Sequence, residues 1–464
     1  MYVMPIVMSP AEWAERTFAA VDLADQRRER RAVTLAARMM RHPDASLPQQ
    51  IGAPSALKAA YRLLDEEDVT HAALSQPHWD ATRERAGRQD VVLLIQDTTE
   101  IDHTHHPKTE GLGPIGNGGG RGYLLQTVLA VVPQPRQVLG IAAQEPFLRK
   151  NAPKGQSCAQ RRSRERESQV WSRLVHAVGP PPEGSTWVHV GDRYSDIFDF
   201  LEACRDQRGH FLIRVAQDRR IYADDGTVES LLAAVSALPA QNQRELHIPA
   251  HDNQPARTAR VSISFRAARL RPPAHSRTKP PLAVFLVRVW EANPPPDLDE
   301  PLEWIVLTSL PTETVAAAWE RAEWYTCRWV VEDYHQWLKT GCSLEQRHLQ
   351  TYEGLVGVLG FLALIAVRLL QLRELARLEP ERLATEAVPH DLARVVAQLA
   401  EVPLSELTLS IFWRTVAQQG GHQGRKGDGP PGWKTLWRGW LDIQLLLEGV
   451  HLASRLPPDL MRCG

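Results

Sequence analysis

Two runs of apolar residues, each ending in an aspartate, constrain the fold of this chain more than any other feature of its sequence. "DVVLLIQD" ends at Asp97, and "TWVHVGD" ends at Asp192. A continuous apolar run of this length, without polar alternation, is typical of a strand that is buried on both faces. We therefore expect a sheet covered by helices on both sides. Both aspartates would lie at its carboxyl edge, where sites collect in open α/β sheets.

The remainder of the chain predicts a mixed architecture around that sheet. With 464 residues, it is long enough for several domains. Apolar residues recur at helical spacing near both ends, whereas short alternating strands separated by proline-rich breaks indicate an antiparallel β-insertion in between. The predicted domains are a helical N-terminal domain (1–80), an α/β domain (81–375, with the β-insertion at about 217–310) and a helical C-terminal domain (376–464).

Charge and cysteine content limit the classes of partner and compartment. The formal net charge is −1, so a polyanion would have to meet local basic segments, here 26–42, 149–166 and 257–279. Five cysteines without a CxxC motif argue against a disulfide framework and fit a reducing cytosol. The N-terminus lacks the basic region of a signal peptide. The longest uncharged apolar run, 354–367, is too short to span a bilayer and predicts a core helix.

A third acid lies in "YTCRWVVEDYHQWLK", residues 325–339, which we predict to be one α-helix. At about 100° per residue, Tyr325, Arg328, Glu332 and Lys339 fall on a stripe about 60° wide. Taken alone, this stripe fits a solvated face with an Arg328–Glu332 ion pair. Each strand-end aspartate, taken alone, fits a turn or a helix cap better than a metal ligand.

Taken together, the three acids allow a second interpretation. Two strand-end aspartates and one helical glutamate are the oxygen donors that a two-metal phosphoryl-transfer site needs. Mg²⁺ prefers carboxylate oxygens and water, and two ions about 4 Å apart can activate the attacking oxygen and stabilise the leaving one. The neighbouring tyrosine, arginine and lysine suit contacts with a phosphodiester backbone.

The pattern Tyr325-x2-Arg328-x3-Glu332-x6-Lys339, with both aspartate segments in order, resembles the signature of DDE transposases of the IS-four family of bacterial insertion sequences. The similarity extends over nearly the whole chain. It implies an RNase H-like catalytic core, with the β-insertion between the second and third acids. It also implies an N-terminal DNA-binding domain and a C-terminal dimerisation domain.

The same resemblance implies cut-and-paste transposition of DNA. Its steps are 3′ strand nicking, hairpin formation, hairpin resolution and strand transfer, with Mg²⁺ as the cofactor and Mn²⁺ as a possible substitute. The expected partners are inverted-repeat ends and target DNA, held by a homodimer in a synaptic complex, with no membrane association. The expected location is the bacterial cytoplasm, on the nucleoid. Two alternatives stay open: an RNase H-like nuclease that cuts without joining, and a catalytically silent end-binding inhibitor.

Individual roles follow from the resemblance position by position. It implies that three residues are catalytic metal ligands: Asp97, Asp192 and Glu332. It implies that seven residues contact DNA: Tyr325, Arg328 and Lys339 on the backbone, Trp304 on an extruded base, Arg214 on the transposon-end strand, and Arg28 and Arg31 on the end DNA. From the residues alone, Trp304 fits a core strand better than a DNA contact, and the arginines fit solvated surfaces.

The sequence departs from the family pattern at three places near the acids. After Asp97 the chain reads "TTEIDHTHH", without the arginine that the family has there. Tyr194 stands where the family has an acid, and Gln336 stands where it has a basic residue. These departures put individual DNA contacts and the hairpin chemistry in question. A further cluster, His103, His105 and His106, could bind a transition metal, but it lies in a loop without cysteines, which makes it a weak signal.

Overall fold

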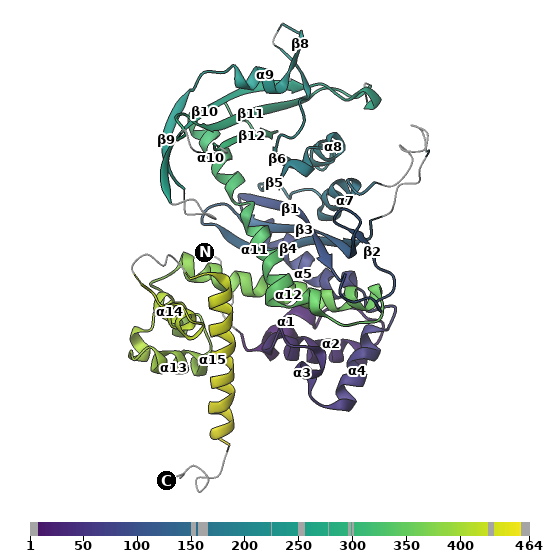
Figure 1. Cartoon of the computed structure of the whole chain (residues 1–464), viewed down its shortest axis with the longest axis vertical. Helices are drawn as coiled ribbons and strands as arrows, with labels where there is room; N and C mark the ends of the chain where they lie inside the picture. The colour runs from purple at the N-terminus through teal and green to yellow at the C-terminus, as the bar shows by residue number, and fades with distance from the viewer. Residues whose placement is uncertain are drawn as a thin grey trace.

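One sheet runs along most of the molecule, and helices gather at one end of it (Figure 1). The computed structural model describes residues 8–149, 166–223, 225–248, 256–276, 278–295, 301–425 and 431–455, together with Gly155 and Leu298. The insertion lies at the top in Figure 1, the central strands in the middle, and the terminal helices below. The predicted mixed α/β class, with helices at both ends of the chain, is confirmed.

The central part of the sheet has the strand order β4-β3-β1-β5-β6. The strands are β1 (Val91–Asp102), β3 (Gly120–Val132), β4 (Gln137–Phe147), β5 (Thr186–Gly191) and β6 (His210–Arg214), with the short β2 (Gly113–Ile115) paired to β3. Strands β1, β5 and β6 are parallel, whereas β3 is antiparallel to both β1 and β4. Strands β5 and β6 therefore end at one edge, whereas β1 continues past that edge to Asp102 beside β3.

The first part of strand β1, Val91–Ile95, is apolar because both of its faces are covered. Leu93 and Ile95 belong to the core that also contains residues of α11 (Trp329–Gln336) and α12 (Tyr352–Leu378). Val92 and Leu94 join a separate cluster with residues of α7 (Gln169–Val178). Helix α8 (Phe198–Asp206) packs against β6. The prediction of a sheet buried on both sides is confirmed.

The insertion continues the same sheet, because β12 pairs antiparallel with β6. Its elements are β7 (Arg220–Tyr222), β8 (Val228–Ser230), α9 (Leu231–Ser236), β9 (Asn242–Ile248), β10 (Arg257–Leu270), β11 (Leu282–Glu291) and β12 (Glu303–Thr308). Strand order proceeds β6-β12-β11-β10, and all of these contacts are antiparallel. The insertion is thus an extension of the core sheet, antiparallel as predicted.

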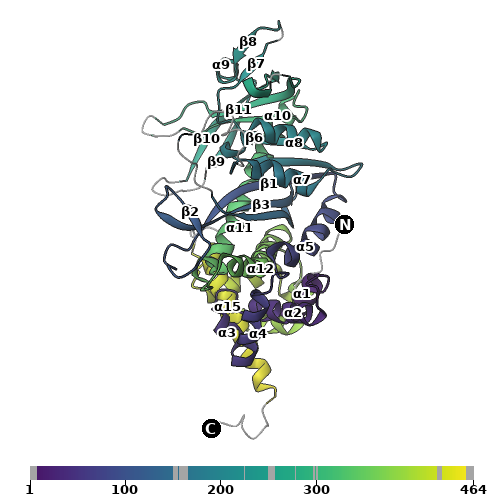
Figure 2. The same cartoon turned by 90° about the vertical axis from the view of Figure 1, so that its right-hand side faces the viewer.

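The terminal helices pack around α12, which crosses the molecule between them and the sheet (Figures 1 and 2). The N-terminal helices are α1 (Pro10–Phe18), α2 (Gln26–Arg41), α3 (Leu47–Ile51), α4 (Pro54–Leu64) and α5 (His71–Ala86). The C-terminal helices are α13 (His390–Leu399), α14 (Leu409–Gln419) and α15 (Trp433–Ala453). Helix α12 is long and apolar enough to cross a membrane, but nearly all of it is buried, which confirms a core helix.

Two glycines set the crossing of α14 and α15. A Cβ on Gly439 of α15 would lie 1.6 Å from the carbonyl oxygen of Val416. A Cβ on Gly420, at the end of α14, would lie 1.8 Å from the carbonyl oxygen of Thr435. The helix backbones are therefore in direct contact, which only glycine permits.

The prediction of one continuous α-helix over 325–339 is wrong. Helix α10 (Val315–Thr326) ends first, α11 follows, and the chain then forms a π-helical turn at Trp337–Gly341. Between α10 and α11, the amides of Cys327 and Arg328 bond to carbonyls three residues back, so the turn tightens. Helix α10 packs on the insertion and α11 on β1. The break lets the chain follow the twist of the sheet between these two surfaces.

Candidate active site and DNA interface

Strand register brings the two predicted aspartates together. Ile95 of β1 pairs with Val190 of β5 in a parallel arrangement. Asp97 lies two residues beyond Ile95, and Asp192 lies two residues beyond Val190. The prediction that Asp97 ends its strand is wrong, because β1 continues to Asp102. Asp97 nevertheless lies level with Asp192, which follows the end of the neighbouring β5.

The same register adds two of the predicted DNA contacts to this edge. Gly191 of β5 pairs with Ile213 of β6, and Asp192 and Arg214 are the residues that follow them. Arg214 therefore lies beside Asp192. Arg214 also pairs with Val306 of β12, two residues away from Trp304. The guanidinium of Arg214 donates to the carbonyl of Glu303 at 3.0 Å. Asp97, Asp192 and Arg214 thus lie level on neighbouring strands or just after them, and Trp304 lies two residues further along β12.

The pleat places all four side chains on the face that α10 and α11 cover. Alternate residues of a strand share a face, and each of the four is two positions from a residue of the core beneath those helices. Asp97 follows Ile95, Asp192 follows Val190, Arg214 follows Leu212, and Trp304 precedes Val306.

The aspartates sit in an environment that disfavours their charge. Burial, followed by the nearby charges of Asp192 and Glu332, raises the pKa of Asp97 to about 7, against the opposing effects of Arg328 and the Thr98 amide. Burial also raises the pKa of Asp192, although the amide of Tyr194 donates to its Oδ1 at 2.9 Å. A cation placed between the two carboxylates would relieve both effects.

Glu332 approaches this pair from α11 but is held by an arginine. Its Oε1 accepts from Nη2 of Arg328 at 2.6 Å, and the Arg328 side chain is 13% exposed. Among the described residues, no three His, Cys, Asp or Glu side chains converge closely enough to hold one metal ion. The donor chemistry of Asp97, Asp192 and Glu332 fits a hard divalent ion, but Glu332 must leave Arg328 to join the other two.

Of the other signature residues, Tyr325 joins the cluster and Lys339 does not. The ring of Tyr325 is buried and lies 6.2 Å from the ring of Trp304. Burial raises the pKa of Tyr325, and the charges of Arg328 and Arg214 oppose this, so both cations are near its hydroxyl. Lys339 lies on the π-helical turn and forms an ion pair with Glu345 at 3.5 Å.

Sequence reasoning missed a buried histidine behind the acids. His335 Nδ1 lies 3.8 Å from Oδ2 of Asp97, and its Nε2 lies 3.2 Å from Oγ1 of Thr127. Burial lowers the pKa of His335 to about 3, so the ring is neutral. Gln144 donates to Thr127 at 2.8 Å and to Tyr334 at 3.0 Å, which extends the network into the core. The signal was available, because residues three apart share a helix face, as Glu332 and His335 do.

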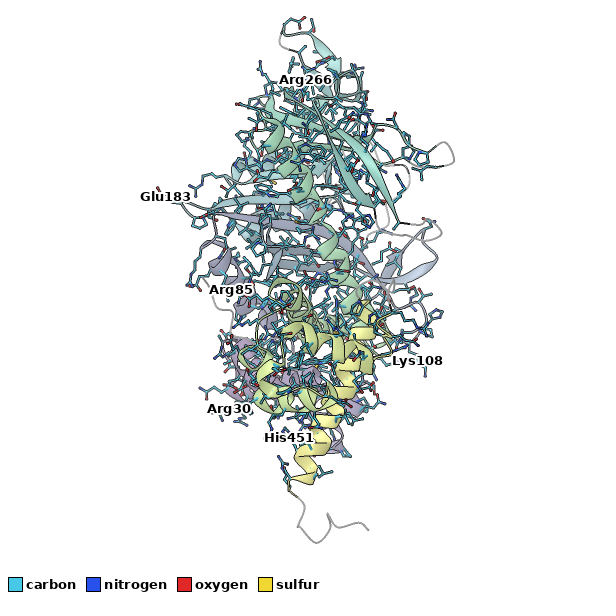
Figure 3. All side chains as sticks on the ribbon, turned by 90° about the vertical axis from the view of Figure 1, so that its left-hand side faces the viewer. Arg30, Arg85, Lys108, Glu183, Arg266 and His451 are labelled. Atoms are coloured by element: carbon cyan, nitrogen blue, oxygen red, sulfur yellow. The ribbon has the colours of Figure 1, made fainter. Side chains whose placement is uncertain are left out.

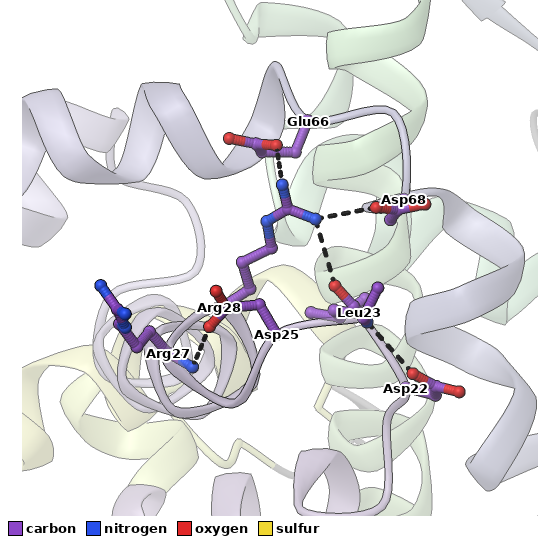
Figure 4. Close-up of polar contacts among 8 residues, drawn as sticks. Asp22, Leu23, Asp25, Arg27, Arg28, Glu66 and Asp68 are labelled. Atoms are coloured by element: carbon purple, nitrogen blue, oxygen red, sulfur yellow. Dashed lines mark hydrogen bonds and ion pairs between the residues drawn. The ribbon is translucent and has the colours of Figure 1, made fainter.

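The two arginines predicted to bind DNA from the N-terminal helices occupy different environments. Arg28 forms ion pairs with Glu66 and with Asp68, the latter at 2.8 Å, and donates to the carbonyl of Leu23 (Figure 4). Its charge is therefore used to tie α2 to the chain after α4. Arg31 is exposed and free to contact a phosphate.

The other basic segments are only partly available to DNA. Most of 149–166 lies outside the described residues, and Arg149 forms an ion pair with Glu167 at 2.9 Å. Within 257–279, Arg266 forms an ion pair with Glu229 at 3.2 Å. Figure 3 shows Arg30 near one end of the molecule and Arg266 near the other, so cationic side chains are spread along its length.

The histidine-rich loop after β1 packs as a structural element. His106 Nε2 donates to the carbonyl of Glu345 at 2.9 Å, which leaves its Nδ1 to accept from Nδ1 of His348 at 3.1 Å. His103 is fully buried and lies parallel to Tyr123, with 5.9 Å between the ring centroids. In the described part of the chain these rings form no group of three that could hold a metal.

Family models match three consecutive parts of the chain. A model described as "Transposase DNA-binding" matches residues 10–69, "Transposase DDE domain" matches 164–368, and "Transposase Tn5 dimerisation domain" matches 364–457. The DDE match includes Asp192 and Glu332, whereas Asp97 precedes it and is linked to them by the strand register.

The fold and these matches define the class: a DNA-cleaving and strand-transferring enzyme with an RNase H-like core that depends on a divalent metal. Within that class, the chain belongs to the DDE transposases related to Tn5 transposase. The matched N- and C-terminal models identify DNA as its partner and the homodimer as its assembly.

Proposed function

We propose that this transposase moves an insertion sequence by a cut-and-paste mechanism, with Asp97, Asp192 and Glu332 as its metal ligands. The main support is the juxtaposition of Asp97 on β1 and Asp192 just after β5, which the strand register places level with each other, with a helical glutamate near them. Mg²⁺ is the proposed ion, with Mn²⁺ as a substitute. When bound, the ions would activate the attacking oxygen and neutralise charge on the phosphate being cut.

The chain's own residues would position the DNA for that chemistry. With Glu332 as a metal ligand, Arg328 would be free to pair with a phosphate oxygen of the DNA, and its charge would stay compensated. Tyr325 and Arg214 flank Arg328 and hold the same backbone. Trp304, partly exposed beside Tyr325, stacks on a base extruded during hairpin formation. Lys339 would reach the backbone only after releasing Glu345.

The proposed sequence of events is a 3′ nick, a hairpin, hairpin resolution and strand transfer into target DNA. Two copies would hold two inverted-repeat ends in a synaptic complex, in the bacterial cytoplasm on the nucleoid. Exposed apolar residues on α15 offer a surface for the second copy: Leu445, Leu446, Val450 and Leu452. Arg31 would contact the end DNA, and Arg28 would act by fixing the helix that presents Arg31. The boundaries of the catalytic domain, after residue 80 and at residue 375, are also part of this proposal.

Cleavage of duplexes that carry the inverted repeats flanking the gene tests the proposal. Asp97→Ala, Asp192→Ala and Glu332→Ala should each abolish Mg²⁺-dependent cleavage while leaving the mobility shift of end DNA unchanged. Asp333→Asn is the matched control, because Asp333 follows Glu332 but pairs with Arg373 on α12. Undiminished cleavage in all three variants would refute the assignment.

The assay also separates the two alternative functions. A nuclease that does not join would nick the ends but leave no strand-transfer product with a supercoiled target. A silent inhibitor would shift the ends, yet nick them with neither Mg²⁺ nor Mn²⁺. The transposase should give both the nick and the joined product.

A further inference from the structure

Tyr194 and Trp329 are the two most exposed aromatic side chains in the described part of the chain, at 81% and 56%. Both lie next to the candidate acids. Tyr194 is two residues after Asp192, and Trp329 is three residues before Glu332. A large ring that keeps more than half of its water contact gains little from folding, so folding alone does not explain why both exposed rings lie here.

Tyr194 is held firmly at its backbone and left free at its ring. It lies in a 3₁₀ turn, Arg193–Ser195, whose first amides are capped by Asp192. The hydroxyl of the buried Ser195 donates to the carbonyl of Asp192 at 2.6 Å. Among the described residues, no side chain bonds to the Tyr194 hydroxyl or packs on its ring. The turn therefore presents an unoccupied aromatic surface at a fixed place.

Cations surround the same turn. Arg193 is exposed, and both it and Arg328 lie close enough to oppose the raised pKa of Asp192. Arg214 lies at the end of the neighbouring strand. Positive charge interleaved with an aromatic ring is the arrangement that binds single-stranded DNA, because cations contact the backbone and bases stack on the ring.

We propose that Tyr194 is a positioning residue that stacks on an unpaired base of the DNA strand being cut, one or two nucleotides from the scissile phosphate. This inference rests on the proposed function. Two residues of chain span at most about 7 Å, and stacked bases rise about 3.4 Å per step. The ring therefore reaches bases within about two steps of a phosphate held at Asp192. Trp304 holds its base from β12, so the two rings serve different nucleotides.

A base-stacking assay with full-length protein tests the role of Tyr194. End duplexes carry 2-aminopurine at single positions around the cleavage site, and complexes are formed with Ca²⁺ to prevent cutting. Wild-type protein should quench the probe at one position in a way that Tyr194→Ala abolishes and Trp304→Ala does not. Tyr194→Phe should retain the quenching, because the ring and not the hydroxyl makes the contact. Tyr222→Ala, on β7, is the matched control.

Cleavage rates at saturating DNA give the second measurement. Loss of one base stack should slow Tyr194→Ala by about tenfold to a hundredfold, with Tyr194→Phe close to wild type. Unchanged quenching and unchanged cleavage in Tyr194→Ala would overturn the inference, as would a Tyr194→Phe variant that behaves like Tyr194→Ala. A wild-type protein that cuts no end DNA would instead refute the proposed function, and the quenching experiment would still decide the stack.

Discussion

Replacing Asp97 by asparagine should stabilise the metal-free protein above neutral pH. Asp97 binds its proton more tightly in the folded protein, with a pKa of about 7, than in an unfolded chain, where the value is 3.8. Its contribution to the free energy of unfolding is therefore complete below pH 3.8 and is lost as the pH rises to about 7. An asparagine side chain at this position has no charge to bury, so the variant escapes this loss.

The size of the effect follows from the same two values. Each tenfold change in proton affinity is worth about 1.36 kcal/mol, so the interval from 3.8 to about 7 sets a ceiling of about 4 kcal/mol. The Asp97 side chain is 18% exposed, so solvent reduces this electrostatic effect only slightly. We expect Asp97→Asn to gain about 2–4 kcal/mol at pH 8.5, less than half of that at pH 5, and almost nothing below pH 4.

Guanidinium unfolding in EDTA, followed by tryptophan fluorescence at pH 5 and pH 8.5, measures this difference. Millimolar Mg²⁺ at pH 8.5 should narrow it, because the ion binds the folded wild type and not the variant. Asp102→Asn, on the same strand, is the control of opposite sign. The pKa of Asp102 is lowered, first by the Thr104 hydroxyl, so that variant should lose stability. Equal midpoints for wild type and Asp97→Asn at pH 8.5, or a gap independent of pH, would refute the reasoning.

Two further predictions concern the terminal helices. Arg28→Ala should cost about 1 kcal/mol in N-terminal stability, because its partners are solvated. Arg31→Ala should leave stability unchanged but weaken binding of end DNA, and it should reduce the slope of log affinity against log salt by about 0.9. If Arg31→Ala instead lost stability and Arg28→Ala lost only DNA binding, this division of roles would be contradicted. Gly439→Ala should destabilise the α14–α15 crossing by more than about 3 kcal/mol in thermal unfolding. Gly449→Ala, on the same helix but facing open space, should not, and equal effects would disprove the proposed close contact.

The strands were predictable because their signal is local. An unbroken apolar run implies burial on both faces wherever the strand lies, and "DVVLLIQD" carries that information by itself. The pairing of Asp97 with Asp192 required more. It depends on register between segments about ninety residues apart, which no local pattern encodes. The resemblance supplied the grouping that the sheet geometry now supports.

The break between α10 and α11 could not be predicted from propensity. The segment has neither glycine nor proline. The tightened turn at Cys327 and Arg328 is instead set by the packing of α10 on the insertion and of α11 on β1. Arg28 and Arg31 show the same limit for side chains. They lie on one helix, three residues apart. Only the fold brings Glu66 and Asp68, which follow α4, close to Arg28.

The continuous hydrogen bonding from β5 through β6 to β12 has a consequence for the substrate. Asp192 and Arg214 lie one strand separation, about 4.8 Å, apart, and Trp304 lies two residues along β12 from the partner of Arg214. The three residues are therefore fixed relative to one another and cannot move independently to follow an intact duplex. If these residues hold phosphate and base as proposed, the nucleic acid would have to kink and unstack to reach them. The enzyme should then prefer ends whose outermost steps deform easily, and select them at positions that no side chain touches.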